Sequence, residues 1–348
     1  MIYFNNDYSE GCHPDILKAL EETNFEQTSG YGCDVHCDHA AQMIRKMCKD
    51  ESLDVHFLVG GTQANLTVVD AALRPHEAAI GAETAHINVH ETGAVEATGH
   101  KVLSLPSSDG KVTALQVAQA VINHMESDAA EHMAKPKLVY ISNPTELGTI
   151  YSLEELKKLR CVCDQFGLYL FMDGARLGYG LTAKDNDLTL GDIAKLCDVF
   201  YIGGTKVGAL FGEAVVIRNP VIKADFRYLI KQHGGMLAKG RLLGIQFETL
   251  MKDDLYFTIA ACANAFADQI RATLDRLGYS YFVPGSTNQI FPILPDTLLE
   301  NLRAEVTFNI EKRVDDTHQA IRFCTSWATK ADNVDRLCNL LEELSELN

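Results

Sequence analysis

Short apolar runs alternate with amphipathic stretches through the first two-thirds of the chain. The runs have the length of strands, and the stretches between them keep the three-to-four-residue spacing of helices. This alternation is typical of β–α–β units and predicts an α/β fold with a mostly parallel seven-stranded sheet. The predicted strands are His56–Val59, Ala78–Gly81, Val102–Leu105, Leu138–Ser142, Leu168–Met172, Val199–Ile202 and Ala214–Ile217.

Two of the intervening helices are predicted to begin with a capping box, in which a hydroxyl and a Gln or Glu three residues later satisfy free backbone N–H groups. Thr113 and Gln116 form one box, and Ser152 and Glu155 form the other, just before LKKLRCVCDQF. A further predicted helix, Thr62–Leu73, directly follows a strand and a Gly-Gly pair.

After about residue 245 the pattern changes. A long helix is predicted near Tyr256–Leu277, followed by shorter strands and a final helix in which the apolar residues from Val334 to Leu344 keep helical spacing. We therefore predict an N-terminal arm (residues 1–24), a large α/β domain (25–245) and a small C-terminal α+β domain (246–348).

Composition narrows the class of partner. The net charge of −16, from 47 acidic and 31 basic residues, argues against nucleic acid or an anionic membrane as partner, since both need basic footprints. The start lacks the pattern of a signal peptide, and no 18 apolar residues run together. The ten cysteines then indicate reduced thiols. We expect a cytoplasmic protein that acts on a small molecule.

One cysteine–histidine cluster raises the question of a metal. Cys33, His36, Cys37 and His39 lie within seven residues, but they lack a C-x-x-C knuckle and a second ligand pair at zinc-finger distance. We predict no metal site, and the zinc content of the purified protein tests this prediction.

The segment LYLFMDGAR, residues 168–176, is an apolar strand that ends in the carboxylate of Asp173. Open α/β sheets bind ligands at the carboxyl ends of their strands. A carboxylate there can keep a pyridinium nitrogen protonated, so that the ring withdraws electrons. Arg176 offers a planar fork for a substrate carboxylate or a cofactor oxygen. Alone, the segment is also consistent with an ordinary strand-end Asp and a surface Arg.

The segment FYIGGTKVGA, residues 200–209, displays Lys206 on a glycine turn after a strand. An amine in such a place can reach a cofactor aldehyde, and loss of water lowers its pKa toward the neutral nucleophile. A solvated loop lysine is the alternative. The spacing of 33 residues from Asp173 fits one helix and one strand, which places both residues at one sheet edge. Together they predict a pyridoxal-phosphate (PLP) enzyme.

Three further motifs fit this prediction. Gly60-Gly61-Thr62 gives free N–H groups at a helix start for a phosphate, without the spacing of a Walker A or G-x-G-x-x-G loop. His86 follows a short strand, where its ring can stack on a pyridine and exchange protons, although a single histidine is often structural. Lys239 and Arg241 form a cationic pair in GGMLAKGRLLG that can neutralise a phosphate, or can simply be solvated.

Together the motifs resemble the L-threonine aldolase and β-eliminating lyase family of fold-type-I PLP enzymes, along nearly the whole chain. The shared segments are NNDYSEGCHPDILKAL, GYGCD, GGTQAN, the Ala85-His86 segment, MDGAR, GGTKVG, TNQIFPIL and IRFCTSWAT. The resemblance implies a PLP-dependent transferase-like large domain. It also implies cleavage of L-threonine, L-allo-threonine and related β-hydroxy amino acids to glycine and an aldehyde.

The resemblance also implies individual roles. Lys206 would be the Schiff-base lysine, Asp173 the partner of the ring nitrogen and His86 the stacking residue. Gly61 and Thr62 would hold the phosphate, and Arg176 and Arg322 would bind the substrate carboxylate. Lys239 and Arg241 would also reach a phosphate. The resemblance implies a homodimer or homotetramer with shared active sites, in which Tyr31 would come from a neighbouring subunit to bind the substrate.

Two departures from the family pattern affect how the substrate hydroxyl is handled. Asn143-Pro144-Thr145 stands where one branch has Asn-Thr-His, so a second active-site histidine is missing. Asn6-Asp7 replaces the Ser-Asp of many relatives, and Ser9 remains a substrate-binding candidate. His86 is our candidate base for the hydroxyl proton. The alternatives are another PLP reaction, such as β-elimination or transamination, and a non-catalytic PLP- or metal-binding scaffold.

Overall fold

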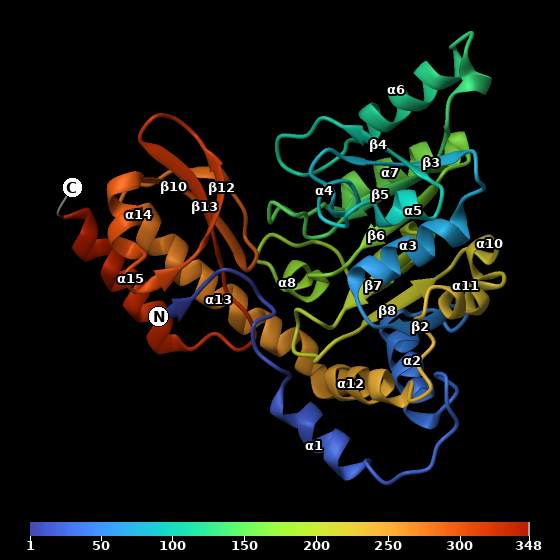
Figure 1. The fold of residues 1–348 in the computed structure, drawn as a ribbon, viewed down its shortest axis with the longest axis horizontal. Helices are drawn as coiled ribbons and strands as arrows, with labels where there is room; N and C mark the ends of the chain where they lie inside the picture. Colours follow the sequence, from blue (N-terminus) through green and yellow to red (C-terminus); the bar gives the residue numbers. More distant parts are fainter. Residues whose placement is uncertain (347–348) are drawn as a thin grey trace.

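The computed structural model describes residues 1–346, in two packed parts (Figure 1). The larger part holds a seven-stranded sheet in the order β2-β8-β7-β6-β5-β3-β4. Its strands are β2 (Asp54–Leu58), β3 (Glu77–Ala82), β4 (Lys101–Leu105), β5 (Lys135–Ser142), β6 (Tyr169–Asp173), β7 (Val199–Gly203) and β8 (Glu213–Ile217). All seven strands predicted from the apolar runs are present, with ends that differ by a few residues.

The direction of the strands decides where their ends meet. β8 pairs antiparallel with both β2 and β7, whereas the pairs from β7 through β6, β5 and β3 to β4 are parallel. The carboxyl ends of the six like-directed strands therefore share one edge with the amino end of β8. In the register, Glu213 lies between Leu58 of β2 and Gly203 of β7 at that edge.

Helices cover the sheet and connect its strands. Those of the larger part and the arm are α1 (Pro14–Glu22), α2 (Val35–Cys48), α3 (Gly61–Ala72), α4 (His86–Val89), α5 (Ala94–Ala97), α6 (Ala114–Met125), α7 (Leu153–Phe166), α8 (Leu177–Leu181), α9 (Leu190–Leu196), α10 (Pro220–Lys223), α11 (Phe226–Gln232) and α12 (Arg241–Met251). Both predicted capping boxes are confirmed, at the starts of α6 and α7.

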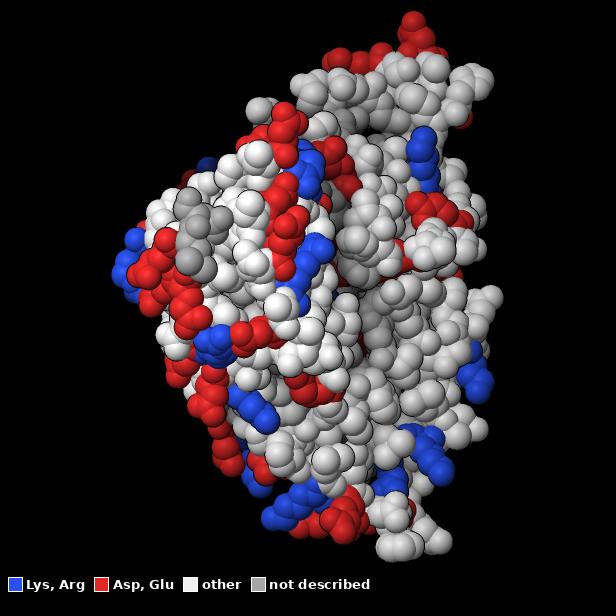
Figure 2. Space-filling view, turned by 60° about the vertical axis from the view of Figure 1, so that its left-hand side comes forward, with Lys and Arg blue, Asp and Glu red and all other residues white. Residues whose placement is uncertain are grey.

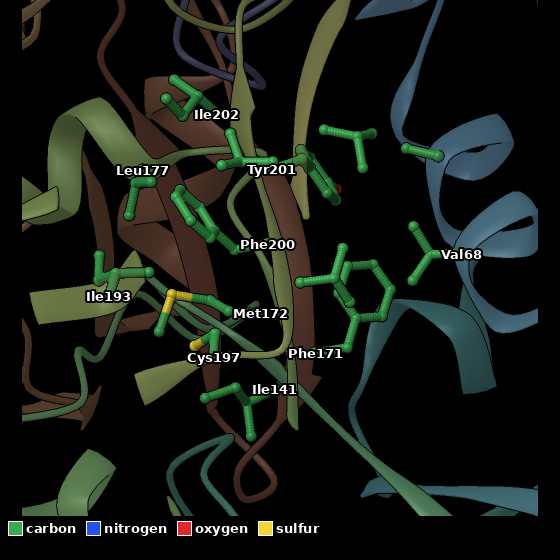
Figure 3. Packing of buried hydrophobic residues seen from close by; sticks show 14 of the residues in the cluster. Val68, Ile141, Phe171, Met172, Leu177, Ile193, Cys197, Phe200, Tyr201 and Ile202 are labelled. Atoms are coloured by element: carbon green, nitrogen blue, oxygen red, sulfur yellow. The ribbon is translucent and has the colours of Figure 1, made fainter. Parts of the chain in front are cut away.

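The core lies on both faces of the sheet. In Figure 3, Val68 of α3 faces Phe171 on one side, and Ile193 of α9 lies beside Met172 and Phe200 on the other. Neighbouring residues of a strand point to opposite faces, so a strand covered on both sides is apolar throughout. This is why the predicted strands appear in the sequence as continuous apolar runs rather than alternating ones.

The smaller part packs around the second half of one long helix, α13 (Leu255–Arg276), which extends to it from the larger part (Figure 1). An antiparallel sheet in the order β12-β13-β10-β9 and two more helices complete it. Its elements are β9 (Tyr281–Val283), β10 (Gln289–Pro295), β12 (Asn309–Arg313), β13 (His318–Cys324), α14 (Asp296–Leu302) and α15 (Ala331–Ser345). β1 (Ile2–Tyr3) pairs with β11 (Val306–Thr307), so the N-terminal arm begins against the smaller part.

The predicted division at residue 245 falls inside α12, and it stays a prediction. None of the helices within residues 1–346 is long and apolar enough to cross a membrane. On the face in Figure 2, the described acidic and basic side chains are interspersed, without a broad basic patch.

Candidate active site

A cavity of about 780 Å3 opens at the sheet edge where the strands end. It is lined by the turns after β2, β3, β5, β6 and β7, by the N-terminal arm, and by β12 and β13 of the smaller part. The predicted residues that line it are Gly61, Thr62, His86, Asp173, Arg176, Lys206 and Arg322. Residues far apart in sequence thus meet because their strands end at one edge.

Asp173, the last residue of β6, is buried and lines this cavity. Its Oδ2 accepts hydrogen bonds from the Tyr140 hydroxyl (2.5 Å) and the Asn65 amide (3.0 Å), and its Oδ1 accepts one from the Ala175 N–H (2.9 Å). Burial alone raises the pKa of Asp173, but hydrogen bonds from the hydroxyls of Tyr140 and Tyr201 and from the Ala175 N–H, together with the charge of His86, leave the pKa below its usual value. Asp173 is therefore held as a carboxylate.

Lys206 lies on the turn after β7, close to the turn after β6. The two turns approach so closely that a Cβ on Gly203 would lie 2.3 Å from the Ala175 carbonyl oxygen, which is why glycine is required there. Burial and the positive charge of Arg176 lower the pKa of Lys206, against the opposing charges of Asp7, Asp173 and Glu213. A lowered pKa favours the neutral, nucleophilic amine.

The turn before α3 supplies free backbone donors at the same edge. Gly60 is extended, and α3 begins at Gly61 with no side chain capping its first N–H groups. A Cβ on Gly61 would come within 3.2 Å of the Tyr201 hydroxyl, so this turn lies close to β7. Uncapped N–H groups at a helix start favour an anion such as a phosphate.

His86 begins α4, and its ring is held by a buried carboxylate. His86 Nδ1 lies 2.7 Å from Glu91 Oε1, which also accepts from the Asn65 amide at 2.6 Å. Because Asn65 donates to Asp173 as well, a polar chain links His86 through Glu91 and Asn65 to Asp173. With Nδ1 bonded to Glu91, Nε2 is the ring nitrogen left for a ligand.

The two predicted carboxylate-binding arginines differ. Arg176 donates from Nε and Nη2 to the two oxygens of the buried Asp7, at 2.7 and 3.0 Å. Burial raises the pKa of Asp7, but the charges of Arg176 and Lys206 hold this pKa below its usual value. Arg322 donates to the Asn5 carbonyl and more distantly to Gln289, and its buried Nε has no partner within residues 1–346. Arg322 is thus the better placed of the two for a substrate carboxylate.

The residues present fit PLP. A carboxylate suits the ring nitrogen, an amine of lowered pKa suits the aldehyde, uncapped N–H groups suit the phosphate, and an unpaired guanidinium nitrogen suits an amino-acid carboxylate.

The comparison with protein families agrees with this geometry. A family model described as beta-eliminating lyase matches residues 9–297. The chain belongs to the beta-eliminating lyase family.

Individual proteins similar to this chain include threonine aldolases. The chain is 31% identical to a low specificity L-threonine aldolase from Pseudomonas sp. over 308 residues, 86% of each chain. A solved structure of Leishmania major threonine aldolase has a TM-score of 0.96 and 46% identity, covering 99% of this chain and all of that one. Thermus thermophilus aspartate aminotransferase shares the fold, with a TM-score of 0.72 at 13% identity over 99% of this chain and 91% of that one.

Four predicted site residues lie outside the cavity of this lyase-family chain. Ser9 donates to Asn6 Oδ1 and lines a separate cavity near Trp327, whereas its neighbour Tyr8 lines the site. Tyr31 lies in another cavity, formed with α2 and α11. Lys239 and Arg241 also lie outside the cavity. Lys239 is exposed, and Arg241 donates to the carbonyl oxygens of Thr23 and Asn24.

Several polar groups of the site were not predicted. Tyr140 and Asn65 lie within a buried strand and a buried helix face, and their only signal is a polar group inside an apolar pattern. Glu213 accepts from Thr205 Oγ1 at 2.8 Å, and burial together with the charge of Asp173 raises its pKa to about 8. Ser142, the last residue of β5, and Glu146, in the turn that follows, also line the cavity.

The Cys33–His39 cluster has other contacts. His36 lies 2.8 Å from a carboxylate oxygen of both Glu26 and Glu248, and His39 lies 3.1 Å from Glu248. Within residues 1–346, no group of three or more His, Cys, Asp or Glu side chains has an arrangement that could hold a metal ion.

Proposed function

We propose that this protein is a PLP-dependent L-threonine aldolase. Its substrates are L-threonine, L-allo-threonine and related β-hydroxy amino acids, and its products are glycine and an aldehyde. The observation that carries the proposal is that Lys206 and Asp173 meet in one cavity with Arg322. The 46% identity to the Leishmania major threonine aldolase, over nearly the whole chain, supports this reaction on the shared fold.

When bound, PLP supplies a carbonyl carbon that captures amines and a ring that stabilises negative charge at the substrate Cα. Lys206 Nζ is the amine that holds the cofactor between turnovers. Asp173 keeps a proton on the ring nitrogen, which its lowered pKa and its three hydrogen bonds allow. The N–H groups of Gly61 and Thr62 bind the phosphate.

The substrate is oriented by its carboxylate. Arg322 takes the carboxylate with its guanidinium group, while Arg176, held by Asp7, adds positive charge and its remaining Nη1. Fixing the carboxylate and the amine aligns the Cα–Cβ bond for cleavage. With PLP bound, His86 would stack on the cofactor, and its Nε2 would exchange the β-hydroxyl proton directly or through a water.

We further propose a cytoplasmic homodimer or homotetramer. The exposed positions of Tyr31 and Lys239, away from the cavity of their own chain, support the idea that they act at the cavity of a neighbouring subunit.

Product analysis with L-threonine tests the proposal. The purified, PLP-loaded protein is expected to release glycine and acetaldehyde in equal amounts. Release of a keto acid and ammonia instead would assign the protein to the eliminating members of the family.

A further inference from the structure

One wall of the cavity carries an acidic side chain that the proposed function leaves without a role. Glu146 follows β5, lines the cavity with His86 and is partly buried. Its Oε1 accepts from the backbone N–H of His86 (2.9 Å) and from the hydroxyl of Ser142 (2.7 Å). In the described part of the chain, both hydrogen bonds fall on Oε1 and leave Oε2 for a ligand.

The surroundings of Glu146 suit a group that gains and loses a proton. Burial raises the pKa of Glu146 and the nearby charge of Asp173 raises it further, against the hydrogen bonds from the Ser142 hydroxyl and from the backbone N–H groups of Glu146 itself and His86. A carboxyl group whose pKa moves toward neutrality accepts a proton more strongly and can still release it.

The other acidic groups of the cavity are already committed. Asp173 receives three hydrogen bonds, and Glu213 bonds to Thr205 beside the lysine turn. Glu311 lies exposed on β12, in the smaller part of the molecule. Glu146 therefore remains as the carboxyl group on the His86 wall.

The same wall is where the sequence lacks a second histidine. Asn143-Pro144-Thr145 directly precedes Glu146 and stands in the place of the Asn-Thr-His of one branch of the family. The Thr145 hydroxyl bonds to Thr149 and Asp109, so it is engaged away from His86. An acid–base group one residue further along the turn can serve the same oxygen.

We propose that Glu146 is a second catalytic residue: it accepts the proton of the substrate β-hydroxyl, and His86 Nε2 holds the hydroxyl oxygen instead of taking that proton itself. This assignment rests on the proposed aldolase function. The hydroxyl O–H bond breaks as an O–H bond to Glu146 Oε2 forms, the Cα–Cβ bond breaks with its electron pair left on Cα, and Cβ becomes an aldehyde carbon. Glu146 then releases its proton to water and Cα takes one from water, with no net oxidation or reduction.

Glu146→Gln tests this role in the PLP-loaded protein. Glutamine keeps an oxygen that can accept from His86 and Ser142, but it cannot take up the hydroxyl proton. The kcat/KM for L-threonine is expected to fall at least about 100-fold, the usual size of a general-base contribution. Exchange of the glycine α-proton in D2O, followed by NMR, needs no β-hydroxyl and is expected to stay within about threefold.

Binding supplies a readout that does not depend on turnover. The dissociation constant for glycine, from the change in visible absorbance, is expected to match the wild type. Glu77→Gln is the matched control, because Glu77 is also buried and accepts a backbone N–H, from Arg74 at 2.8 Å, but lies at the opposite end of β3. It is expected to leave cleavage and exchange unchanged.

Two results would overturn the role of Glu146. Near-normal cleavage of L-threonine by Glu146→Gln would remove it as a proton acceptor, and an equal loss of cleavage and glycine exchange would make its role structural. A wild-type protein that exchanges the glycine proton but releases no acetaldehyde would instead defeat the proposed function itself, and the Glu146 assignment with it.

Discussion

Two histidine–glutamate pairs in this protein look alike but differ in what they leave free. At the cavity, His86 bonds through Nδ1 to the buried Glu91, and Nε2 remains for a ligand. On α2, His36 bonds through both ring nitrogens, to Glu248 of α12 and to Glu26. In the proposed function the first pair orients a ring for chemistry, whereas the second joins α2 to α12 and to the segment after α1.

The wider surroundings of the pairs differ in the same way. Glu91 is part of a polar chain that continues through Asn65 to Asp173 and the cofactor site. Glu26 and Glu248 are partly exposed, and their chain of contacts ends at His39. The comparison teaches that a free nitrogen and a route to the reacting atoms, rather than a carboxylate partner, distinguish a catalytic histidine from a structural one.

The largest effect is expected at Asp173, where the hydrogen-bonded series from His86 ends. Asp173→Asn removes the negative charge that keeps the ring nitrogen protonated, so kcat for L-threonine is expected to fall by about a thousandfold, or about 4 kcal/mol of barrier. Steady-state kinetics at saturating PLP measure the fall, and the PLP content of the variant checks that it is loaded. Near-normal kcat would show that Asp173 does not serve the ring nitrogen.

A smaller effect is expected at Glu91, in the middle of the hydrogen-bonded series that runs from His86 to Asp173. Glu91→Gln keeps a hydrogen-bond partner for His86 but removes the charge and no longer fixes one ring tautomer. A loss of about 10- to 100-fold in kcat/KM is expected, as for other residues that orient a catalytic ring. Nitrogen NMR of His86 in the same variant is expected to show mixed tautomers. A single, unchanged tautomer would separate Glu91 from the orientation of His86.

The smallest effect is expected at the second pair. Burial of His36 lowers its pKa, but the hydrogen bonds and charges of Glu26 and Glu248 outweigh this and raise the pKa above its usual value. A raised folded-state pKa contributes stability that is full below about pH 6.5, the unfolded value, and is lost as the pH rises through the folded one.

His36→Gln is therefore expected to lower the free energy of unfolding by no more than about 1 kcal/mol, and more at pH 6 than at pH 9. Urea unfolding at the two pH values measures the difference, while kcat is expected to stay the same. A loss of kcat as large as that of Glu91→Gln would erase the distinction between the two pairs.

Much of the large sheet and the meeting of Asp173 with Lys206 at the centre of the site could be predicted from the sequence. Asp173 and Lys206 each follow a buried apolar run, and parallel strands bring the ends of such runs together, so their meeting could be predicted. Gly61 and Thr62 follow from the same rule. The capping boxes at Thr113 and Ser152 could be predicted because both of their partners are local.

Long-range polar pairs could not be predicted in the same way. Asp7 and Arg176 lie 169 positions apart, and no local pattern indicates that the arm occupies two of the donors expected for the substrate. Asn65 and Tyr140 lie within runs that the hydrophobic pattern assigns to the core. The roles predicted for Tyr31, Lys239 and Arg241 stay predictions, since they depend on a second chain.

The central claim is that Lys206 holds PLP over Asp173, and the visible absorption spectrum tests it most directly. The purified wild-type protein is expected to show a PLP band that changes on addition of glycine, and Lys206→Ala is expected to lose the wild-type band and release its PLP on dialysis. A wild-type protein without a visible band, or a band that is identical in Lys206→Ala, would contradict the account.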